Sequence, residues 1–318
     1  MQNERCSHRG GKRIGGVLPG VSAVHLRAAV AGQLIRKDGQ GIRQDLSGLP
    51  GIRANEQGKG IVVTGFRTIG FVGGGRVTRF LLEGWKRGAK TQPVVRVADC
   101  NADVLAALKR DFPAIAAVSA AEAAADLVIL AVHPPVMKDV MAAIKPHVRP
   151  TATVLSLAPK VTAAAIVGAL GVARVVRMVP NAPCAIGKGY NPVAYGKGVD
   201  AETKVSLMAL FAPWGETVEV AERDLEAYAV ISAMGPTYMW FQWQKIRELA
   251  MTFGLDGAAA DRAILKTVEG AAECLLASGR APEKVMDMIP VKPLKDDEAT
   301  WMAAYGAKLS GLYDKIKV

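Results

Sequence analysis

The sequence predicts an α/β protein in which a Rossmann-type doubly wound sheet is followed by an all-helical domain. Short apolar runs of strand type alternate with segments of helical spacing along the middle of the chain, a pattern typical of a parallel sheet. A glycine run directly follows the first of these strands, and beyond Arg223 there is almost no strand signal. We therefore expect an extension over residues 1–60, a dinucleotide-binding domain over 61–222 and a helical domain over 223–318.

The first sixty residues are predicted to form a disordered extension. They contain many Gly and Arg, almost no aromatic residues and no sustained hydrophobic period. An Arg-rich, acid-poor start also has features of a transit peptide, and a start site chosen too far upstream is a third interpretation. Ten of these residues are basic and four acidic, so the segment carries six of the eleven net positive charges. The rest of the chain is only modestly basic, which argues against a nucleic-acid partner.

Composition favours a folded protein of the reducing cytoplasm. Half of the residues are hydrophobic, yet there is no run of about 18 uncharged apolar residues, so we expect no membrane span. The four cysteines are scattered, without a CxxC pair or a histidine at ligand spacing. This spacing argues against a disulfide framework and predicts no metal site.

The first strand–turn–helix unit carries the strongest functional signal. Residues 68–72 form an apolar run, Gly73, Gly74 and Gly75 follow, and residues 77–85 have helical spacing. Glycines at this turn let the backbone approach a pyrophosphate, and the helix N-terminus then receives the negative charge. The third glycine position of the fingerprint is Thr78, which we expect to loosen the packing of the helix on the strand.

A second strand, residues 94–99, ends in Asp99, about 25 residues after the glycines. A carboxylate there accepts hydrogen bonds from the ribose hydroxyls and repels a 2′-phosphate, so the cofactor is predicted to be NAD(P)H with a lean to NADH. The alternative is that Asp99 lies one residue too late and caps the next helix. Arg76 and Arg96 lie close in the sequence, and their positive charges oppose this preference for NADH.

The remaining elements extend the same pattern. Strands are expected over residues 126–132, 153–157, 174–179 and 215–220, and helices over 103–110, 120–125 and 162–170. The strand at 126–132 runs into His133-Pro134, and the strand at 174–179 runs into Pro180-Asn181-Ala182-Pro183. Ligands of doubly wound sheets bind at strand ends of this kind.

Together these motifs resemble the pyrroline-5-carboxylate reductase family. The resemblance rests on four segments in the same order: Ile69-Gly70-Phe71-Val72-Gly73-Gly74-Gly75, Leu130-Ala131-Val132-His133-Pro134, Val175-Val176-Arg177-Met178-Val179-Pro180-Asn181-Ala182-Pro183 and Ser232-Ala233-Met234-Gly235-Pro236-Thr237-Tyr238. It implies a homodimer or higher homo-oligomer whose helical domains interlock for dimerisation. It also implies reduction of a small-molecule cyclic imine, 1-pyrroline-5-carboxylate, to proline in proline biosynthesis.

The expected cofactor contacts combine the fingerprint with the resemblance: Gly70, Gly73, Gly74, Gly75, Arg76, Val77, Asp99, Ala131, Val132, His133, Pro134, Asn181 and Pro183. The expected catalytic residues are Asn181, beside the nicotinamide, together with Lys292 and Tyr238. Hydride delivery to an imine needs mainly positioning of the two reactants, so no buried acid–base pair is required.

The substrate half departs from the family. A substrate loop of pattern Ser-Pro-Gly-Gly-Thr-Thr is here Ile289-Pro290-Val291-Lys292-Pro293-Leu294, which lacks both glycines and both threonines. Lys292 or Lys295 replaces the lost contacts by pairing with a carboxylate, or both are solvated surface lysines. His133 stands in place of a lysine, Pro159-Lys160 in place of a small-residue pair, and Met234 in place of a small polar residue.

Other residues have open interpretations. His133 orients the substrate or a phosphate, or is a neutral histidine at a strand end. Cys184 is interpreted as a small buried residue rather than a nucleophile, because no histidine is paired with it in the sequence. The aromatic residues near Tyr238 and Trp240 are core or dimer contacts, with pocket lining as the alternative.

Three functions compete. The first is reduction of a C=N bond by NAD(P)H. The second, favoured by the altered loop at residues 289–294, is a dimeric dinucleotide-binding protein without turnover. The third is a hydroxyacid dehydrogenase, which needs a lysine base on the first long helix of the second domain. Lys245 is the only candidate there, and its spacing from Gly235 does not favour it.

Overall fold

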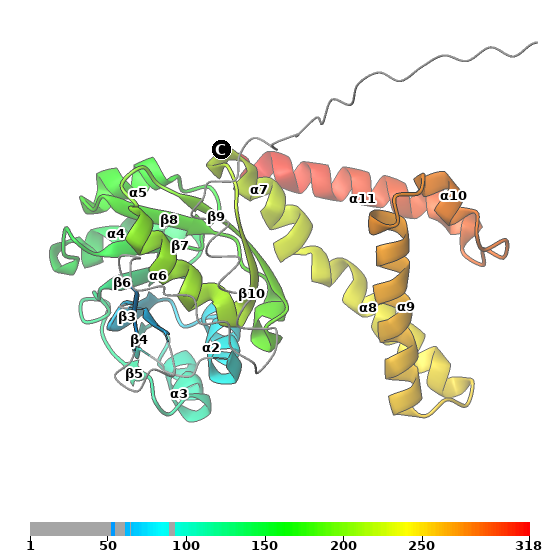
Figure 1. Ribbon diagram of the computed structural model, residues 1–318, viewed down its shortest axis with the longest axis horizontal. Coiled ribbons are helices and arrows are strands. Elements are labelled where there is room, and N and C mark those ends of the chain that lie inside the picture. Colours follow the sequence, from blue (N-terminus) through cyan, green and yellow to red (C-terminus); the bar gives the residue numbers. More distant parts are fainter. Residues whose placement is uncertain (1–51, 55–60, 64, 89–92) are drawn as a thin grey trace, which may run out of the picture. The chain divides into compact units, whose positions relative to one another are not determined.

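The computed structural model describes residues 52–54, 61–63, 65–88 and 93–318 (Figure 1). The predicted extension over residues 1–60 lies outside these ranges except for β1 (Ile52–Ala54), which pairs with β2 (Ile61–Val63). The chain divides into two compact units between Val62 and Val63, and the second unit holds all the elements that follow.

An eight-stranded sheet forms the centre of the second unit (Figure 1). In spatial order its strands are β10 (Gly215–Glu219), β9 (Gly189–Tyr195), β8 (Arg174–Met178), β7 (Thr153–Ser156), β6 (Leu127–Leu130), β3 (Thr68–Val72), β4 (Val94–Ala98) and β5 (Ala116–Ala117). The six strands from β8 to β5 are mutually parallel, and β9 pairs antiparallel with β8. Within this sheet the chain enters at β3, runs outward through β4 to β5, and then returns to β6, which lies on the other side of β3. This is the doubly wound order.

Helices cover both faces of this sheet. They are α2 (Arg76–Gly88), α3 (Ala102–Asp111), α4 (Met137–Ile144), α5 (Ala163–Leu170) and α6 (Ala201–Phe211). Successive side chains of a strand point to opposite faces, so β6 buries Leu127 and Ile129 in one core, with α2, α3 and α6, and Val128 and Leu130 in the other, with α4 and α5. Two buried faces explain why the strands read as continuous apolar runs.

Aromatic stacking fixes α2 on its face of the sheet. The ring of Trp85 stacks on Trp214 with centroids 5.0 Å apart, and Trp214 stacks on Phe211 at 5.2 Å. Both indoles have acceptors, since Trp85 Nε1 donates to the Leu210 carbonyl and Trp214 Nε1 to the Leu81 carbonyl. The helix that begins at the glycine turn is therefore held rigidly along its length.

The C-terminal part is helical, as predicted. It comprises α7 (Leu225–Tyr228), a π-helical segment (Ala229–Ala233), α8 (Gly235–Thr252), α9 (Gly257–Ala277), α10 (Pro282–Met286) and α11 (Lys295–Ile316). No side chain of α8, α10 or α11 is buried, and Ala260 is the only buried residue of α9. None of the described helices is long and apolar enough to cross a membrane.

The structure differs from the sequence prediction at residues 120–125 and at β9, and it adds α4, α6 and β5. Residues 120–125 form a turn rather than a helix, because Ser119 N and Oγ both donate to the Glu122 carboxylate and close a single turn. Six residues are also too few for an independent helix. The strand β9 was not predicted, because Pro192 in its middle removes a backbone donor and weakens the strand signal.

Candidate functional site

Five loops meet at one edge of the sheet. The parallel strands β4, β3, β6, β7 and β8 all end there, with Val72 paired to Ala98 on one side and to Leu130 on the other. The chain reverses direction between β3 and β6, which makes this gap the topological switch point. Ligands of doubly wound folds bind at that point, and the glycine turn and the loop after β6 flank it.

The glycine turn has the geometry that a dinucleotide needs. Gly73 adopts a φ of +107°, and a Cβ there would lie 2.5 Å from the Ala131 carbonyl oxygen. Gly75 is exposed, with open space where a Cβ would point, and no acidic side chain occupies the first turn of α2. The free N–H groups of that turn suit a pyrophosphate, and the exposed Arg76 adds a positive charge. The residues of the site therefore fit the cofactor that the sequence predicted.

The sequence predicts that Thr78 loosens the packing of α2 on β3, whereas the structure shows a tightly held side chain. Its side chain is fully buried, and its hydroxyl donates to the Gly73 carbonyl at 2.6 Å. The threonine thus stabilises the glycine turn from inside the first turn of α2. Gly70 supports the same region from the strand, since a Cβ there would lie 1.7 Å from the Ala123 carbonyl oxygen. Gly70 is therefore required by packing and is not exposed to a ligand.

Asp99 lies directly after β4 and binds the glycine turn. One carboxylate oxygen accepts from the Gly74 N–H at 2.7 Å, and the other accepts from the Asn101 N–H at 2.8 Å. The cap of α3 is Asn101, whose side chain accepts from Asp103 N and Val104 N. Asp99 therefore does not cap the helix, and its carboxylate lies beside the glycine turn.

The loop after β6 begins with Ala131, whose N–H donates to the Val72 carbonyl at 2.8 Å and holds the loop against the glycine turn. Val132 is half-buried, His133 is exposed, and Pro134 begins a short 3-10 turn, Pro134–Val136. The His133 side chain makes no capping hydrogen bond to that turn. The structure thus brings the four predicted residues of this loop to the switch point.

Asn181 connects the sheet to the helical part. Pro236 has no N–H, so it cannot donate to the Ser232 carbonyl four residues earlier. Asn181 Nδ2 donates to that carbonyl instead, at 3.2 Å, while Asn181 Oδ1 accepts from the Tyr190 N–H at 3.1 Å. The freed carbonyl lies in the π-helical segment Ala229–Ala233, a type of distortion that is frequent at functional sites. Asn181 is thereby held in one orientation beside Pro183.

Tyr238 binds the same π-helical segment. Its hydroxyl donates to the Val230 carbonyl at 2.7 Å, and its ring contacts Tyr305 edge-on. Burial raises the pKa of the Tyr238 phenol, and the neighbouring Tyr305 adds to this shift. Asn181 and Tyr238, predicted from distant segments, therefore both donate to carbonyls of one short segment.

Lys292 lies apart from this arrangement. It is exposed in the turn between α10 and α11, and so is Lys295 at the start of α11. The backbone carbonyl of Lys292 accepts from the Lys295 N–H, so the two residues close one local turn. The single chain thus presents both lysines on the surface of the helical part.

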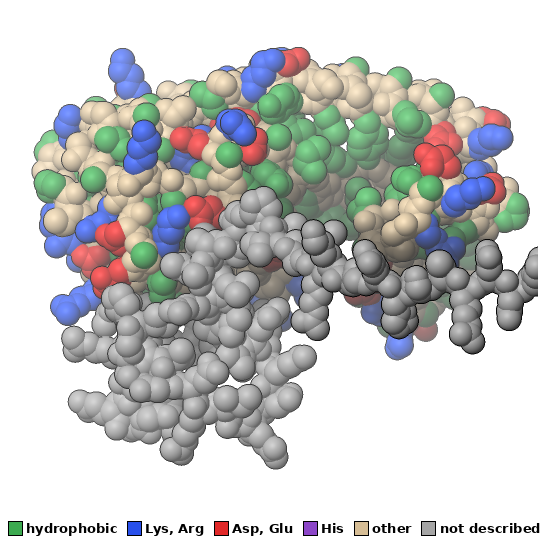
Figure 2. Space-filling model, turned by 45° about the horizontal axis from the view of Figure 1, so that its top comes forward, with side chains coloured by type: hydrophobic (Ala, Val, Ile, Leu, Met, Phe, Trp, Pro, Cys, Tyr) green, Lys and Arg blue, Asp and Glu red, His purple; other side chains and the backbone are tan. Residues whose placement is uncertain are grey.

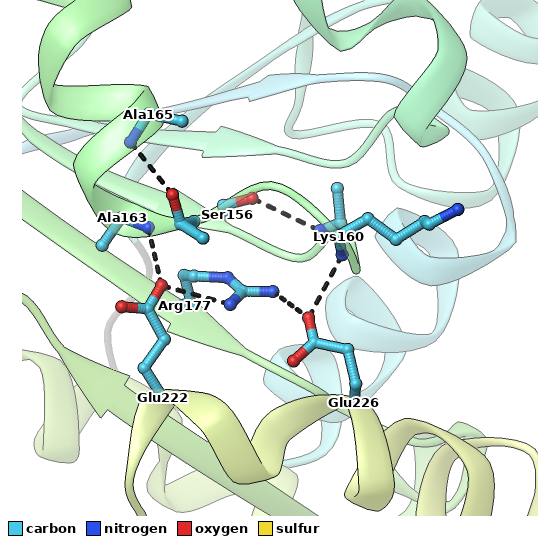
Figure 3. A network of polar contacts seen from close by, with 9 residues as sticks. Ser156, Lys160, Ala163, Ala165, Arg177, Glu222 and Glu226 are labelled. Carbon is cyan, nitrogen blue, oxygen red and sulfur yellow. Dashed lines mark hydrogen bonds and ion pairs between the residues drawn. The ribbon is translucent and has the colours of Figure 1, made fainter. Parts of the chain in front are cut away.

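Sequence reasoning missed a buried ion-pair network behind the site (Figure 3). Arg177 on β8 is 2 % exposed and donates to Glu226 at 2.6 Å and to Glu222 at 3.1 Å. Glu226 also accepts from the Lys160 N–H at 3.1 Å, and Glu222 from the Ala163 N–H at 2.6 Å. The signal was an arginine within the apolar run of β8, because a charge so deeply buried needs a paired acid.

Lys160 has an unusual backbone. Its φ is +69°, the only positive value at a non-glycine residue in the described part of the chain. A side chain in this conformation costs of order 1–3 kcal/mol and persists only when its surroundings impose it. The hydrogen bond from its N–H to the buried Glu226 is such a constraint.

Cys184 is a small buried residue, as interpreted from the sequence. Its thiol is fully buried and donates to Asn191 Oδ1 at 2.9 Å. Burial raises the pKa of this thiol to about 11. Cys100, Cys184 and Cys274 are all free thiols, and no group of three metal-ligating side chains occurs among the described residues.

A polar hollow at the opposite edge of the sheet does not compete with this site. It is lined by Arg67, Asp126, Arg149, Arg174, Asp200 and neighbouring residues. Two of its carboxylates already have internal partners, because Asp126 accepts from Thr68 and Arg149, and Asp200 accepts from Thr203.

Large hydrophobic side chains remain exposed on the helical part. Figure 2 shows such side chains gathered in its hollowed face. Phe253 is 78 % exposed and Leu276 81 %, and the other examples include Trp240, Phe241, Ile246 and Leu265. A surface of this composition is covered by another protein surface in soluble proteins.

Comparisons with known proteins agree with this architecture. Residues 68–160 match the family described as NADP oxidoreductase coenzyme F420-dependent, and residues 222–292 match the family described as pyrroline-5-carboxylate reductase dimerisation. The pyrroline-5-carboxylate reductase of Escherichia coli is 29 % identical over 227 residues, covering 70 % of this chain and 84 % of the relative. That of Corynebacterium melassecola is 28 % identical over 224 residues, covering 69 % and 83 %.

Solved structures share the fold. The pyrroline carboxylate reductase of Plasmodium falciparum with NADP bound has a TM-score of 0.67 at 21 % identity, covering 79 % of this chain and 97 % of that one. The pyrroline-5-carboxylate reductase of Coxiella burnetii has a TM-score of 0.56 at 26 % identity, covering 79 % and 94 %. The chain therefore shares the fold of these proteins over 79 % of its length.

Proposed function

Because this chain is a divergent member of the pyrroline-5-carboxylate reductase family, we propose that it reduces the C=N bond of 1-pyrroline-5-carboxylate, or of a related cyclic imine, with NAD(P)H. The observation that carries the proposal is the junction at the switch point. There the glycine turn and the loop after β6 lie at the same edge of the sheet as the Asn181 loop, which is bonded to the helical part.

In this proposal the cofactor lies across the switch point. The first turn of α2, with Gly75, Arg76 and Val77, receives the pyrophosphate, and Asp99 lies on the adenosine side. The loop from Ala131 to Pro134 and the Asn181–Pro183 loop bound the nicotinamide. When bound, the reduced nicotinamide supplies a hydride to the imine carbon, and a proton taken up at nitrogen completes the amine.

The residues of the chain contribute mainly position. Asn181 has one N–H and part of its oxygen committed to the Ser232 carbonyl and the Tyr190 N–H, so its remaining N–H has a fixed direction. Tyr238 holds the π-helical segment that borders the imine. Lys292 stays a prediction, because its exposed turn lies apart from these two residues in the single chain. Such positioning can account for several kcal/mol of a reaction barrier.

We also propose that the functional form is a homodimer or higher homo-oligomer, in which the exposed apolar side chains of α8, α9 and α11 are covered by a second copy. The match of residues 222–292 to a dimerisation family supports this proposal. A cytoplasmic location is proposed from the scattered free cysteines.

The test is a steady-state assay of NADH and NADPH oxidation by the purified full-length protein with 1-pyrroline-5-carboxylate. Substrate-dependent oxidation with proline as the product is expected. The controls omit the imine or the protein. Cofactor binding without any turnover on this or other cyclic imines would refute the reductase proposal.

The lean to NADH is tested separately. Replacing Asp99 by Ser removes the carboxylate that repels a 2′-phosphate, so we expect the ratio of kcat/KM for NADH over NADPH to fall about tenfold or more. Asp103→Ser, an exposed acid on α3, is the matched control. An unchanged ratio in Asp99→Ser would remove the assigned role of Asp99.

A second function is favoured by one observation. The turn at residues 289–294 is exposed and has none of the glycines and threonines of the family's substrate loop. If it no longer holds a substrate, the chain is a non-catalytic dimeric dinucleotide-binding protein. Cofactor binding measured by fluorescence, in a protein without turnover, is the result that this alternative predicts.

A further inference from the structure

The loop after β7 carries a lysine in a position where the fold calls for a glycine. Lys160 has a φ of +69°, and its N–H is bonded to the buried Glu226, which is itself paired with the buried Arg177. The backbone of the loop is therefore fixed by groups that do not involve the Lys160 side chain. In Figure 3 that side chain extends away from both glutamates.

The position of the loop determines what the lysine can reach. Strand β7 lies between β6 and β8, so Lys160 lies between the loop that begins at Ala131 and the loop that holds Asn181. Asp99 follows β4, three strand spacings away on the other side of β3, which is roughly 14 Å. Lys160 is thus on the nicotinamide side of the switch point, away from the adenosine ribose.

The ammonium group of Lys160 forms no ion pair with any residue of the described part of the chain. The residue is exposed. Other cations at this edge are placed differently. Arg76 begins α2 beside the glycine turn, and Lys188 precedes β9 on the far side of β8.

We propose that Lys160 binds the carboxylate of the substrate and so makes the enzyme selective for an imine that carries a carboxylate beside its ring nitrogen. This inference rests on the proposed function and names the substrate class of the same site. An ammonium group on a fixed loop is a suitable partner for a carboxylate. It assigns the binding of the anion to the sheet domain, whereas the exposed turn at residues 289–294 lacks the glycines and threonines of a carboxylate loop.

The first experiment compares three variants with the wild type at saturating NADH. Lys160→Met removes the charge and keeps the strained backbone, Lys160→Gly removes the charge and relieves the backbone, and Lys160→Arg keeps the charge. In the Met and Gly variants the KM for 1-pyrroline-5-carboxylate should rise about 10- to 100-fold, because each variant loses one charged hydrogen bond to the substrate. The KM for NADH should stay within about twofold, and Arg should retain most of the affinity.

The unsubstituted imine, 1-pyrroline, provides the readout that a structural defect would not produce. Wild type should prefer the carboxylated imine, and the Met and Gly variants should lose this preference while turnover of 1-pyrroline changes little. Lys197→Met, an exposed lysine in the turn after β9, is the matched control and should behave as wild type. A rise in KM for NADH, or an unchanged preference in Lys160→Met, overturns the inference.

A binding measurement separates this inference from the proposed function. Titration calorimetry of the NAD⁺-saturated protein with L-proline, and with pyrrolidine as the uncharged comparison, needs no turnover. If the wild type binds proline but has no reductase activity, and Lys160→Met loses the binding, the proposed function fails and the inference stands. If turnover occurs and Lys160→Met binds and reacts as wild type, the inference fails alone. Absence of both turnover and proline binding refutes both.

Discussion

The pair formed by Arg177 and Glu226 gives the sharpest stability prediction. Arg177 is 2 % exposed and Glu226 1 % exposed, and they are joined at 2.6 Å. Replacing Arg177 by Met leaves the Glu226 carboxylate buried with only the Lys160 N–H as a donor. Removing one partner of a buried pair destabilises a protein by about 3–5 kcal/mol, because the other charge is left without compensation.

This loss is large enough to measure as a shift of the melting temperature. For a domain of this size about 1 kcal/mol corresponds to roughly 2–4 °C, so Arg177→Met should melt about 6–20 °C below wild type. Calorimetry or urea unfolding should be run at one protein concentration, since the stability of an oligomer depends on concentration. Arg79→Met is the control, because its pair with Asp111 is partly exposed and should contribute about 1 kcal/mol or less.

A double variant tests the physical reason. Arg177→Met with Glu226→Leu removes both charges and fills the space with apolar groups, so most of the lost stability should return. The expected result is a double variant that is more stable than Arg177→Met alone by at least about 2 kcal/mol. The reasoning is wrong if the two single losses simply add, or if Arg177→Met melts within about 2 °C of wild type.

Three further predictions concern single groups. Burial raises the pKa of Asp126, but hydrogen bonds from Thr68 and Arg149 outweigh burial and hold this pKa below its ordinary value. The stability that the carboxylate contributes is therefore present above its unfolded pKa and is lost as the pH falls through the lower folded pKa. Asp126→Asn should flatten the fall of melting temperature below about pH 4. Iodoacetamide at pH 7.5 should label the exposed Cys100 and leave Cys184 unmodified until the protein is unfolded, because burial raises the pKa of the Cys184 thiol to about 11. Mass spectrometry of the native protein measures which cysteine is labelled, and early labelling of Cys184 would contradict the prediction. Phe241→Asp places a charge on the exposed apolar surface of α8, and sedimentation velocity should show a shift from dimer towards monomer, whereas an unchanged sedimentation coefficient would exclude that surface from the interface.

The parallel strands β3, β4, β6, β7 and β8 could be predicted from local patterns, since continuous apolar runs mark strands buried on both faces. The glycine turn, the helix α2 that follows it and the strand β4 that ends before Asp99 were predicted correctly, because each pattern involves only neighbouring residues. The turn at residues 120–125 was misread as a helix, because a side chain of Ser119 and one of Glu122 close it and composition alone does not reveal that bond. Strand β9 was missed because its pairing with β8 is a long-range contact that overrides the local effect of Pro192.

The sequence by itself determined the fold class and the place of the glycine turn, because these depend on periodicity and short motifs. Only the tertiary structure decided how the site is held together. Asn181 donates to the Ser232 carbonyl that Pro236 leaves without its helical donor, and the Thr78 hydroxyl donates to the Gly73 carbonyl within the glycine turn. Lys160 is kept in a glycine-like conformation by a glutamate 66 residues away. The contacts of Asn181 and Lys160 join residues far apart in the sequence, and no local pattern records such a partner.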